Sequence, residues 1–198
     1  MTIDVGTGDG RAVLDAAARE PETLVLGLDA SAAAMAAASR RAAGPARKGG
    51  RPNARFVLTS AEAAPAPLLG TANLVTVQFP WGSLLRGCLG LDPAVAAGVA
   101  GLVASNGTLE LLLAPAPRDG LAGLPTDAAG VIAAAAATFA PSGFEMAAGR
   151  EATATEIEAS GSSWAKRLAA GQRHGKRNGN GAGDRTVTLV RLVRRVRR

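Results

Sequence analysis

Short apolar stretches alternate with alanine-rich helical stretches along the chain of 198 residues, and this alternation restricts the possible folds most strongly. Strand-like composition occurs at 2–6, 23–29, 54–62, 72–79, 107–114 and 185–193. Helical patterns are found at 9–21, 31–43, 92–104 and 126–140, and in a short stretch containing "SSWAKRLA". Strands separated by helices usually form a parallel sheet with crossover helices. We therefore expect one α/β domain over residues 1–198.

The composition excludes several classes of protein. A single cysteine, Cys88, cannot form an internal disulfide framework and is expected to be a small buried hydrophobe. The lone His174 cannot complete a metal cluster by itself, so no metal site is predicted. No apolar run approaches the roughly 18 residues of a membrane span, and the start "MTIDVGTGDG" lacks a signal-peptide pattern. We expect a cytoplasmic protein that has no membrane partner.

Basic residues are concentrated in two segments. Residues 1–149 hold 10 Lys/Arg and 12 Asp/Glu, whereas residues 150–198 hold 12 Lys/Arg and 4 Asp/Glu. Within the first part, the segment 40–55 contains six basic residues and no acid. Two basic patches on one domain favour a polyanionic partner, and in the cytoplasm this is mostly RNA or DNA. The alternative is that both segments are only solvated charged faces.

The sequence "DVGTGDG" (4–10) joins the first expected strand to the first expected helix, where a parallel sheet binds ligands. Its G-x-G-x-G spacing differs from the G-x-G-x-x-G of dinucleotide sites. Asp4 and Asp9 flank the loop and suit a cationic ligand better than a pyrophosphate. Asp29 ends the second strand, where an acid commonly binds ribose, and Glu62 is placed to meet an adenine or ribose edge. These features favour S-adenosylmethionine over NAD; the alternative is glycines that serve only a tight turn.

Five motifs in this chain, "DVGTGDGR", "GLDAS", "SAEA", "FPWGSLLRG" and "SSWAKRLA", resemble those of one enzyme family. They are similar, in the same order from residue 4 to about 173, to the 16S rRNA (adenine-N1)-methyltransferases that methylate adenine 1408 and confer resistance to aminoglycosides such as kanamycin and apramycin. The resemblance implies a Rossmann-like class I methyltransferase fold with a mostly parallel seven-stranded sheet. It also implies S-adenosylmethionine as donor and 16S rRNA in the assembled 30S subunit as substrate; we expect a monomer.

The resemblance also assigns site residues. For the cofactor, it implies Asp4, Gly6, Asp29, Ala61 and Glu62, and we add the neighbouring Thr7, Gly8 and Ala30 together with Ser162 as expected contacts. Trp81 and Trp164 match the two tryptophans that hold the target base, and we place Phe79 and Ser83 beside them. For RNA, the expected residues are Arg40, Arg41, Arg47, Lys48, Arg51, Lys166, Arg167 and Arg173. They belong to the basic segment 40–55 and to a basic C-terminal region, 160–198.

Physical chemistry agrees with this interpretation. A base in structured RNA must be swung out before its edge can react, and stacking on aromatic faces offsets the loss of base stacking by about 1–3 kcal/mol per base. Adenine N1 already carries a lone pair, so no general base is needed before it attacks. Three alternatives remain: Trp81 as a core or lid residue, a methyltransferase for another RNA or a small molecule, and a non-catalytic RNA-binding module.

Three features depart from the family pattern. Only three residues precede Asp4, whereas the family usually has more N-terminal sequence, so we expect a truncated first strand or a misassigned start. The Gly/Asn-rich loop at 175–184 and the Arg-rich tail "RLVRRVRR" also differ from the usual C-terminus. The tail is expected to be either an extra electrostatic anchor for RNA or a frayed last strand.

Overall fold

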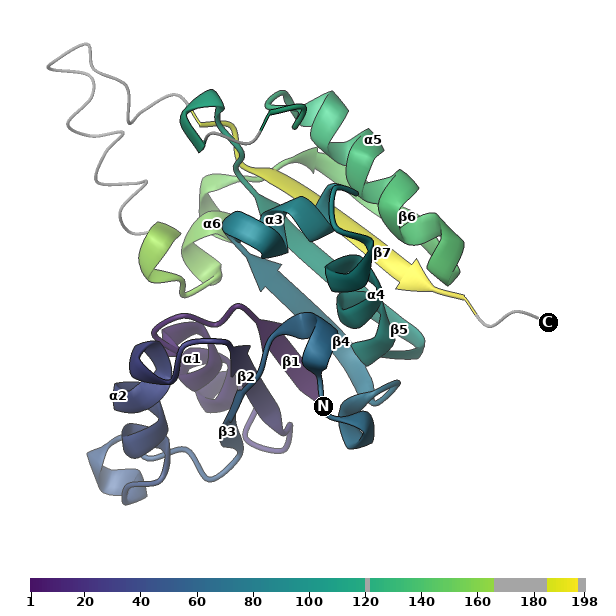
Figure 1. The fold of residues 1–198 in the computed structure, drawn as a ribbon. Helices are drawn as coiled ribbons and strands as arrows, with labels where there is room; N and C mark the ends of the chain where they lie inside the picture. Colours follow the sequence, from purple (N-terminus) through teal and green to yellow (C-terminus); the bar gives the residue numbers. More distant parts are fainter. Residues whose placement is uncertain (120–121, 166–184, 196–198) are drawn as a thin grey trace, which may run out of the picture.

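The computed structural model describes residues 1–119, 122–165 and 185–195. Their centre is a seven-stranded sheet with the strand order β3-β2-β1-β4-β5-β7-β6 (Figure 1). β1 to β5 are parallel to one another, and β7 is antiparallel to both β5 and β6. The strands are Thr2–Val5, Val25–Asp29, Ala54–Leu58, Ala72–Gln78, Val103–Leu113, Phe144–Glu151 and Thr188–Arg194. The predicted mostly parallel seven-stranded α/β sheet is confirmed.

Six α-helices in the described part of the chain cover the sheet on both faces (Figure 1). α1 to α6 comprise Arg11–Arg19, Ala32–Ala42, Gly82–Cys88, Pro93–Leu102, Ala128–Phe139 and Ala154–Ala159. Five short 3₁₀ turns, η1 to η5, comprise Ala46–Lys48, Ala61–Ala63, Ala66–Leu68, Pro117–Asp119 and Ala140–Ser142. Three helix starts follow the sequence signals, because the side chains of Ser31, Asp92 and Asp127 each accept a hydrogen bond from a first-turn backbone N–H.

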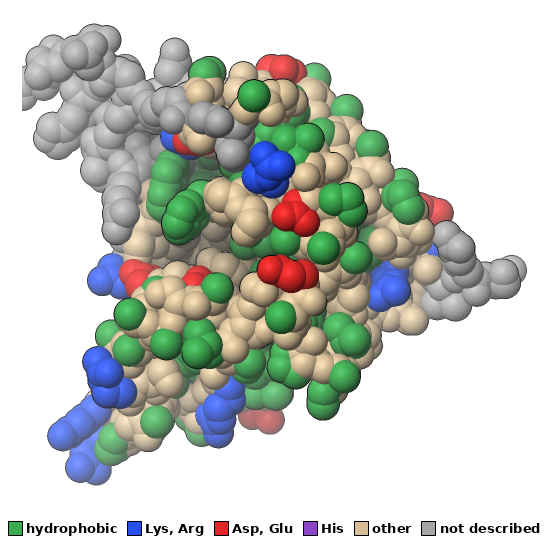
Figure 2. Space-filling model, viewed as in Figure 1, with side chains coloured by type: hydrophobic (Ala, Val, Ile, Leu, Met, Phe, Trp, Pro, Cys, Tyr) green, Lys and Arg blue, Asp and Glu red, His purple; other side chains and the backbone are tan. Residues whose placement is uncertain are grey.

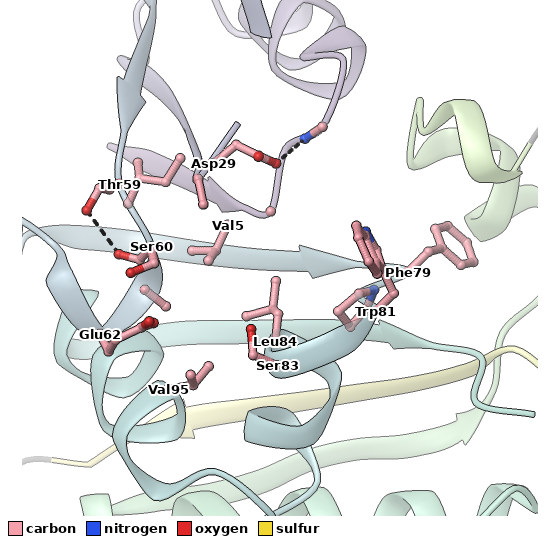
Figure 3. A pocket seen from close by; sticks show the side chains of 16 residues that line it. Val5, Asp29, Thr59, Ser60, Glu62, Phe79, Trp81, Ser83, Leu84 and Val95 are labelled. Atoms are coloured by element: carbon pink, nitrogen blue, oxygen red, sulfur yellow. Dashed lines mark hydrogen bonds between the residues drawn. The ribbon is translucent and has the colours of Figure 1, made fainter. Parts of the chain in front are cut away.

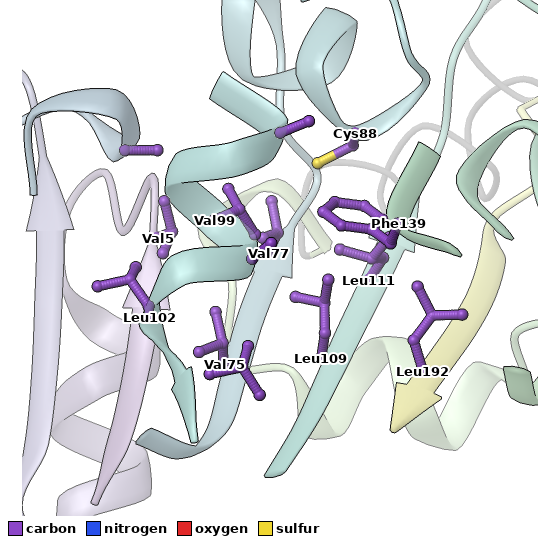
Figure 4. Close-up of a cluster of buried hydrophobic side chains, with 14 of the residues drawn as sticks. Val5, Val75, Val77, Cys88, Val99, Leu102, Leu109, Leu111, Phe139 and Leu192 are labelled. Carbon is purple, nitrogen blue, oxygen red and sulfur yellow. The ribbon is translucent and has the colours of Figure 1, made fainter. Parts of the chain in front are cut away.

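The main core lies between the sheet and helices α3, α4 and α5 (Figure 4). Alternate residues of the central strands, such as Val75, Val77 and Leu109, are fully buried there together with Val99 and Phe139. The opposite face is covered by α1 and α2 through a second cluster, which includes Val13, Val25 and Ala54. β1 pairs in parallel with both β2 and β4. The carboxyl ends of these three strands therefore meet at one edge of the sheet.

Cys88 is completely buried in the main core, as predicted. Burial raises the pKa of its thiol to about 12, because no polar solvent stabilises the thiolate. The residue is therefore a packing group rather than a nucleophile.

Three of these strands and α-helices were missed by the sequence analysis. α6 is only six residues long and precedes the stretch "SSWAKRLA" that was expected to be helical. The edge strand β6 is mostly exposed, so its sequence "FEMAAGRE" lacks the alternation of a half-buried strand. Helix α3 is only seven residues long and contains two glycines, which weakens any helical signal.

Other predicted boundaries shift by a few residues. β3 ends at Leu58 rather than at residue 62, and η2 follows it. β5 begins directly after α4, at Val103 instead of residue 107, and β7 covers Thr188–Arg194 instead of 185–193. Of the expected helical stretch "SSWAKRLA", residues 163–165 are helical and the remainder lies outside the described residues. The loop 175–184 and the last three residues of the tail also lie outside them.

Among the described residues, no single helix is long and apolar enough to cross a membrane. The pair α3 and α4, bent by 77° at the break between them, meets the length and composition criteria only when the two are joined. Most of the apolar side chains of this pair pack into the main core.

Candidate active site

The loop between β1 and α1 forms one wall of the candidate site. Gly8 and Gly10 have φ angles of 57° and 70°, a left-handed conformation that glycine adopts without strain. A Cβ atom on Gly10 would lie 2.5 Å from Phe56 Cε1, so this glycine permits close packing. Nothing lies within 4 Å of a Cβ built on Gly8, and this residue borders the pocket. The loop therefore combines a tight turn with open space for a ligand.

The carboxylate of Asp29 closes this loop from the end of β2. Its Oδ2 accepts a hydrogen bond from Gly8 N at 2.8 Å, and its Oδ1 accepts one from Ser31 N at 2.8 Å. Each carboxylate oxygen can accept a further bond, because it carries two acceptor positions. Asp29 is thus held rigidly at the pocket wall and can still bind the hydroxyls of a sugar, as the sequence predicts.

Acceptor atoms gather beneath the glycine loop, around Asp4. Asp4 Oδ1 accepts a hydrogen bond from Thr76 Oγ1 at 2.7 Å. Burial raises the pKa of Asp4 to about 6, hydrogen bonds from the side chains of Thr76 and Thr7 oppose this, and the nearby charge of Asp29 adds to it. Gln78 Oε1 is buried without a hydrogen-bond partner among the described residues. Asp4, Thr7 and Gln78 all border one cavity, which is therefore rich in acceptors and suited to a cationic donor.

The opposite wall comes from η2, α3 and α4 (Figure 3). In Figure 3, Thr59, Ser60 and Glu62 lie on one side of the pocket, and Ser83 and Leu84 face it from α3. Ala61 is buried, whereas Glu62 is exposed at the rim. η2 packs tightly on α4, because a Cβ atom on Gly98 would lie only 2.3 Å from the Ala61 carbonyl oxygen. This pocket has a cavity volume of about 170 Å³ and is partly open to solvent.

The sequence "FPWGS" leaves the end of β4 in a sharply turned conformation. Phe79 has a φ angle of 50°, which is unusual for a bulky residue and often marks a functional site. Its side chain is buried, with 6% exposure, whereas Trp81 is 84% exposed. Figure 3 shows the Trp81 ring at the mouth of the pocket. A core role for Trp81 is thereby excluded, and Phe79 is part of the support rather than an exposed contact.

The cavity bordered by Asp4, Thr7 and Gln78 is a second cavity that adjoins the first pocket. Both tryptophans also border it. The two cavities share Gly6, Gly8, Phe79 and Trp81 as lining residues. Trp164 borders the second cavity together with Ser162 and Ser163, which follow α6. The structure thus brings Trp81 and Trp164, 83 positions apart in the sequence, to one cavity next to the glycine loop. Ser162 borders this cavity, and Ser83 and Ala30 border the first one.

The Trp164 ring is held by two neighbours. It stacks on Phe79 with ring centroids 5.9 Å apart and an interplanar angle of 16°. The Arg185 guanidinium carbon lies 5.1 Å from the Trp164 ring centroid. Arg185 in turn donates to Asp119 Oδ1 and Oδ2 at 2.6 and 3.0 Å and to the Ala114 carbonyl oxygen at 2.8 Å. The ring is thereby ordered without being buried in the core.

The basic segment 40–55 lies on α2, η1 and the start of β3. Figure 2 shows Lys and Arg side chains gathered at the lower left of the molecule, over α2 and the turn that follows it. Arg40, Arg41, Arg47 and Lys48 are exposed. Arg51 is only partly exposed, and its Nη1 donates to the adjacent Gly50 carbonyl oxygen at 2.9 Å. The expected RNA contacts Lys166, Arg167 and Arg173 lie outside the described residues.

Three contributors escaped the sequence analysis: Gln78, Thr76 and Arg185. Gln78 directly precedes "FPWGS" and Thr76 lies two positions earlier, so polar residues near the end of β4 were the available signal. Arg185 gave no local signal, because its partners are Asp119 and Trp164. Among the described residues, no group of three or more His, Cys, Asp or Glu could hold a metal ion.

Comparison with known proteins shows which family this chain matches. The model of the family described as NpmA, 16S rRNA (adenine(1408)-N(1))-methyltransferase, matches residues 1–181. A 16S rRNA (adenine(1408)-N(1))-methyltransferase from Streptoalloteichus hindustanus is 38% identical over 176 residues, covering 85% of this chain and 80% of that protein.

Two solved structures are also similar. One is the crystal structure of a tryptophan mutant of the 16S rRNA (adenine(1408)-N(1))-methyltransferase from Catenulisporales acidiphilia with its cosubstrate SAM. Its TM-score is 0.81 at 31% identity, covering all of this chain and 86% of that one. The other is the aminoglycoside resistance methyltransferase NpmB1, with a TM-score of 0.75 at 35% identity, covering 98% of this chain and 86% of that one.

Proposed function

The chain belongs to the 16S rRNA (adenine(1408)-N(1))-methyltransferase family, and we propose that it transfers a methyl group from S-adenosylmethionine to N1 of adenine 1408 in 16S rRNA. The product would confer resistance to aminoglycosides. One observation supports this reaction above all others: two tryptophans border a cavity that shares four lining residues with the glycine-loop pocket. A stacked base placed there would lie next to a cofactor held by the loop.

The residues present fit S-adenosylmethionine. Asp29 offers carboxylate oxygens to the ribose hydroxyls, and Glu62 lies at the rim of the same pocket for the adenine or ribose edge. The acceptors of Asp4, Thr7 and Gln78 suit the three donors of an ammonium group, and Gln78 Oε1 otherwise lacks a partner among the described residues. An NAD pyrophosphate would instead meet the negative charges of Asp4 and Asp9, so the acceptor set favours a cationic cofactor.

The chain acts mainly by positioning. S-adenosylmethionine supplies an electrophilic methyl group on a sulfonium. Trp81 and Trp164 would hold the swung-out adenine by stacking, which is worth about 1–3 kcal/mol per base. Pro80 and the positive φ of Phe79 fix the direction in which Trp81 leaves the strand. N1 attacks with its own lone pair, so the site needs no general base, and alignment in a partly dehydrated cavity lowers the barrier.

The partner of the enzyme is proposed to be the assembled 30S subunit. The exposed cations Arg40, Arg41, Arg47 and Lys48 lie on one side of the domain, apart from the pocket residues (Figure 2). Such a patch suits the phosphates of folded rRNA, where it can fix the register of docking while the tryptophans select the base. We propose that the enzyme acts as a monomer in the cytoplasm, where ribosomal subunits are found.

RNA labelling would test the substrate. Purified protein and methyl-labelled S-adenosylmethionine would be incubated separately with 30S subunits, free 16S rRNA, 23S rRNA and tRNA. We expect incorporation near one methyl group per 30S subunit and much less in the other RNAs. Preferential labelling of tRNA or 23S rRNA would support a methyltransferase with another substrate. Absence of S-adenosylmethionine binding by calorimetry would support a non-catalytic RNA-binding module.

A further inference from the structure

The segment that carries Trp164 is fastened to the glycine loop through Asp9. Ser163 Oγ donates a hydrogen bond to Asp9 Oδ2, across 154 positions of sequence. The other oxygen of the same carboxylate, Oδ1, accepts a bond from Arg11 N at 3.2 Å, and Arg11 Nε lies 3.4 Å from Oδ2. Asp9 therefore links the start of α1, the end of the glycine loop and the residue next to Trp164.

Gly161 forms a second contact between this segment and α1. It has a φ angle of 68°, and a Cβ atom built on it would lie 3.1 Å from Asp15 Oδ2 and 3.3 Å from Ala12 Cα. Its backbone thus lies directly against α1. Between Gly161 and Trp164 the chain is held by a local bond, because Ser162 Oγ accepts a hydrogen bond from Trp164 N at 3.2 Å.

We propose that Asp9 is a positioning residue for methyl transfer: through its hydrogen bond from Ser163 it sets the place of Trp164 relative to the glycine loop. This inference rests on the proposed function. The loop is where the cofactor would be held, and Trp164 would hold one face of the adenine. A hydrogen bond between the glycine loop and the segment that carries Trp164 would keep the methyl group and adenine N1 aligned. A misplacement of about 1 Å can lower the rate roughly a hundredfold.

The groups that would bind the cofactor are held in place by hydrogen bonds that do not involve Ser163. Asp29 binds Gly8 N and Ser31 N, and Asp4 is bound by Thr76, so neither depends on Ser163. Loss of the Ser163 hydroxyl should therefore lower the rate of transfer and leave cofactor affinity nearly unchanged. A purely structural role would instead lower the stability and the active fraction without changing kcat per folded molecule.

Fluorescence would test the placement of Trp164 without any RNA. The chain has two tryptophans, so a Trp81→Phe background leaves Trp164 as the single indole emitter. In this background we expect Ser163→Ala to raise acrylamide quenching of Trp164 by about twofold, because the segment loses its anchor. Ser163→Thr keeps the hydroxyl and should quench like the parent. Ser105→Ala, on β5 at the opposite end of the sheet, is the matched control.

Kinetics would test the consequence in a chain that retains both tryptophans. We expect Ser163→Ala to lower kcat on 30S subunits about tenfold, with the KM for RNA and the Kd for S-adenosylmethionine within about twofold. Ser163→Thr should restore most of kcat, and Asp9→Ala/Ser163→Ala should be no slower than Asp9→Ala alone, because both changes break one bond.

Unchanged kcat and unchanged quenching in Ser163→Ala would overturn the inference while leaving the proposed function intact. Fully additive losses in the double variant would also overturn it. If the parent chain itself fails to methylate 30S subunits, the proposed function fails, and the fluorescence experiment still decides whether Asp9 positions Trp164.

Discussion

Trp81 is the residue whose surroundings differ most from those of an ordinary large aromatic side chain. It is 84% exposed, follows the left-handed Phe79 and the rigid Pro80, and directly precedes helix α3. Under the proposed function, a swung-out base would stack on this exposed ring.

Replacement of Trp81 by alanine should therefore affect transfer and little else. We expect Trp81→Ala to lower the methylation rate by at least about a hundredfold through loss of base alignment. The Kd for S-adenosylmethionine should change by less than about threefold, and the Tm by less than about 2 °C, since the side chain is exposed. Calorimetry and thermal melts check the two controls. A large loss of cofactor binding would show instead that Trp81 shapes the cofactor pocket.

Asp4 should make cofactor binding depend on pH. Burial raises its pKa to about 6 in the ligand-free site, and a bound cation favours the carboxylate form and lowers that pKa. As pH falls below 6, Asp4 takes up a proton before binding, so the Kd for S-adenosylmethionine should rise, by up to roughly tenfold per pH unit. Titration calorimetry between pH 5 and 8 measures this.

Asp4→Asn should bind the cofactor more weakly at about pH 7.5 and show a much flatter pH profile, because the amide carries no titrating charge. Glu22→Gln, in an exposed turn, is the control and should keep the parent profile. A parent protein whose affinity is constant over the same pH range would contradict the assignment of Asp4 to a cationic group.

At the scale of elements, the sequence predicts six of the seven strands and misses β6, which is the most exposed. Continuous apolar strands such as Val25–Asp29 are recognisable because both faces are covered. β6 is an edge strand with one buried residue, Phe144, so its sequence holds little information about its conformation. The site follows the same rule: the glycine loop and "FPWGS" are local signals, whereas Gln78 and Arg185 matter only through tertiary contacts.

The contact between α4 and η2 should control the shape of the pocket rim where Glu62 lies. A Cβ atom on Gly98 would lie 2.3 Å from the Ala61 carbonyl oxygen and 2.7 Å from Glu62 N, so Gly98→Ala must move η2. We expect a loss of about 1–3 kcal/mol in the free energy of unfolding from overpacking, together with weaker cofactor binding. Urea denaturation and calorimetry measure the two effects.

Gly101→Ala on the same helix is the matched control. A Cβ atom there would lie 3.4 Å from the flexible end of Leu69, which is an ordinary contact. Its stability should match the parent within about 1 kcal/mol, because helix propensity favours alanine. Equal behaviour of the two variants would show that η2 accommodates the methyl group.

At the scale of the whole molecule, charge and chemistry occupy different parts of the surface. The cations of α2 and η1 lie on one side in Figure 2, whereas the tryptophans lie at the carboxyl edge of the sheet. Docking and base selection are thereby assigned to different residues, and they should respond to different mutations. In the sequence, the basic segment 40–55 is separate from the aromatic motifs, whereas the second basic region, 160–198, contains Trp164.

Charge removal on the basic segment should weaken RNA docking in a way that depends on salt. For Arg47→Gln/Lys48→Gln, we expect the slope of log K for 30S binding against log salt to fall in magnitude by about two, because each removed cation leaves one phosphate with its counterions. Fluorescence polarisation with labelled protein over a salt series measures it. Arg19→Gln, at the exposed C-terminal end of α1 and outside both basic segments, is the control. A slope equal to that of the parent would show that Arg47 and Lys48 only face solvent.

Primer extension on 16S rRNA tests the central claim most directly. Intact 30S subunits would be incubated with the protein and S-adenosylmethionine, and reverse transcription would then be read across the decoding site. A methyl group on N1 blocks Watson–Crick pairing, so we predict a strong stop at adenine 1408 with the parent chain and none with Trp81→Ala. Full read-through at adenine 1408 with a folded, cofactor-binding parent chain would contradict the account.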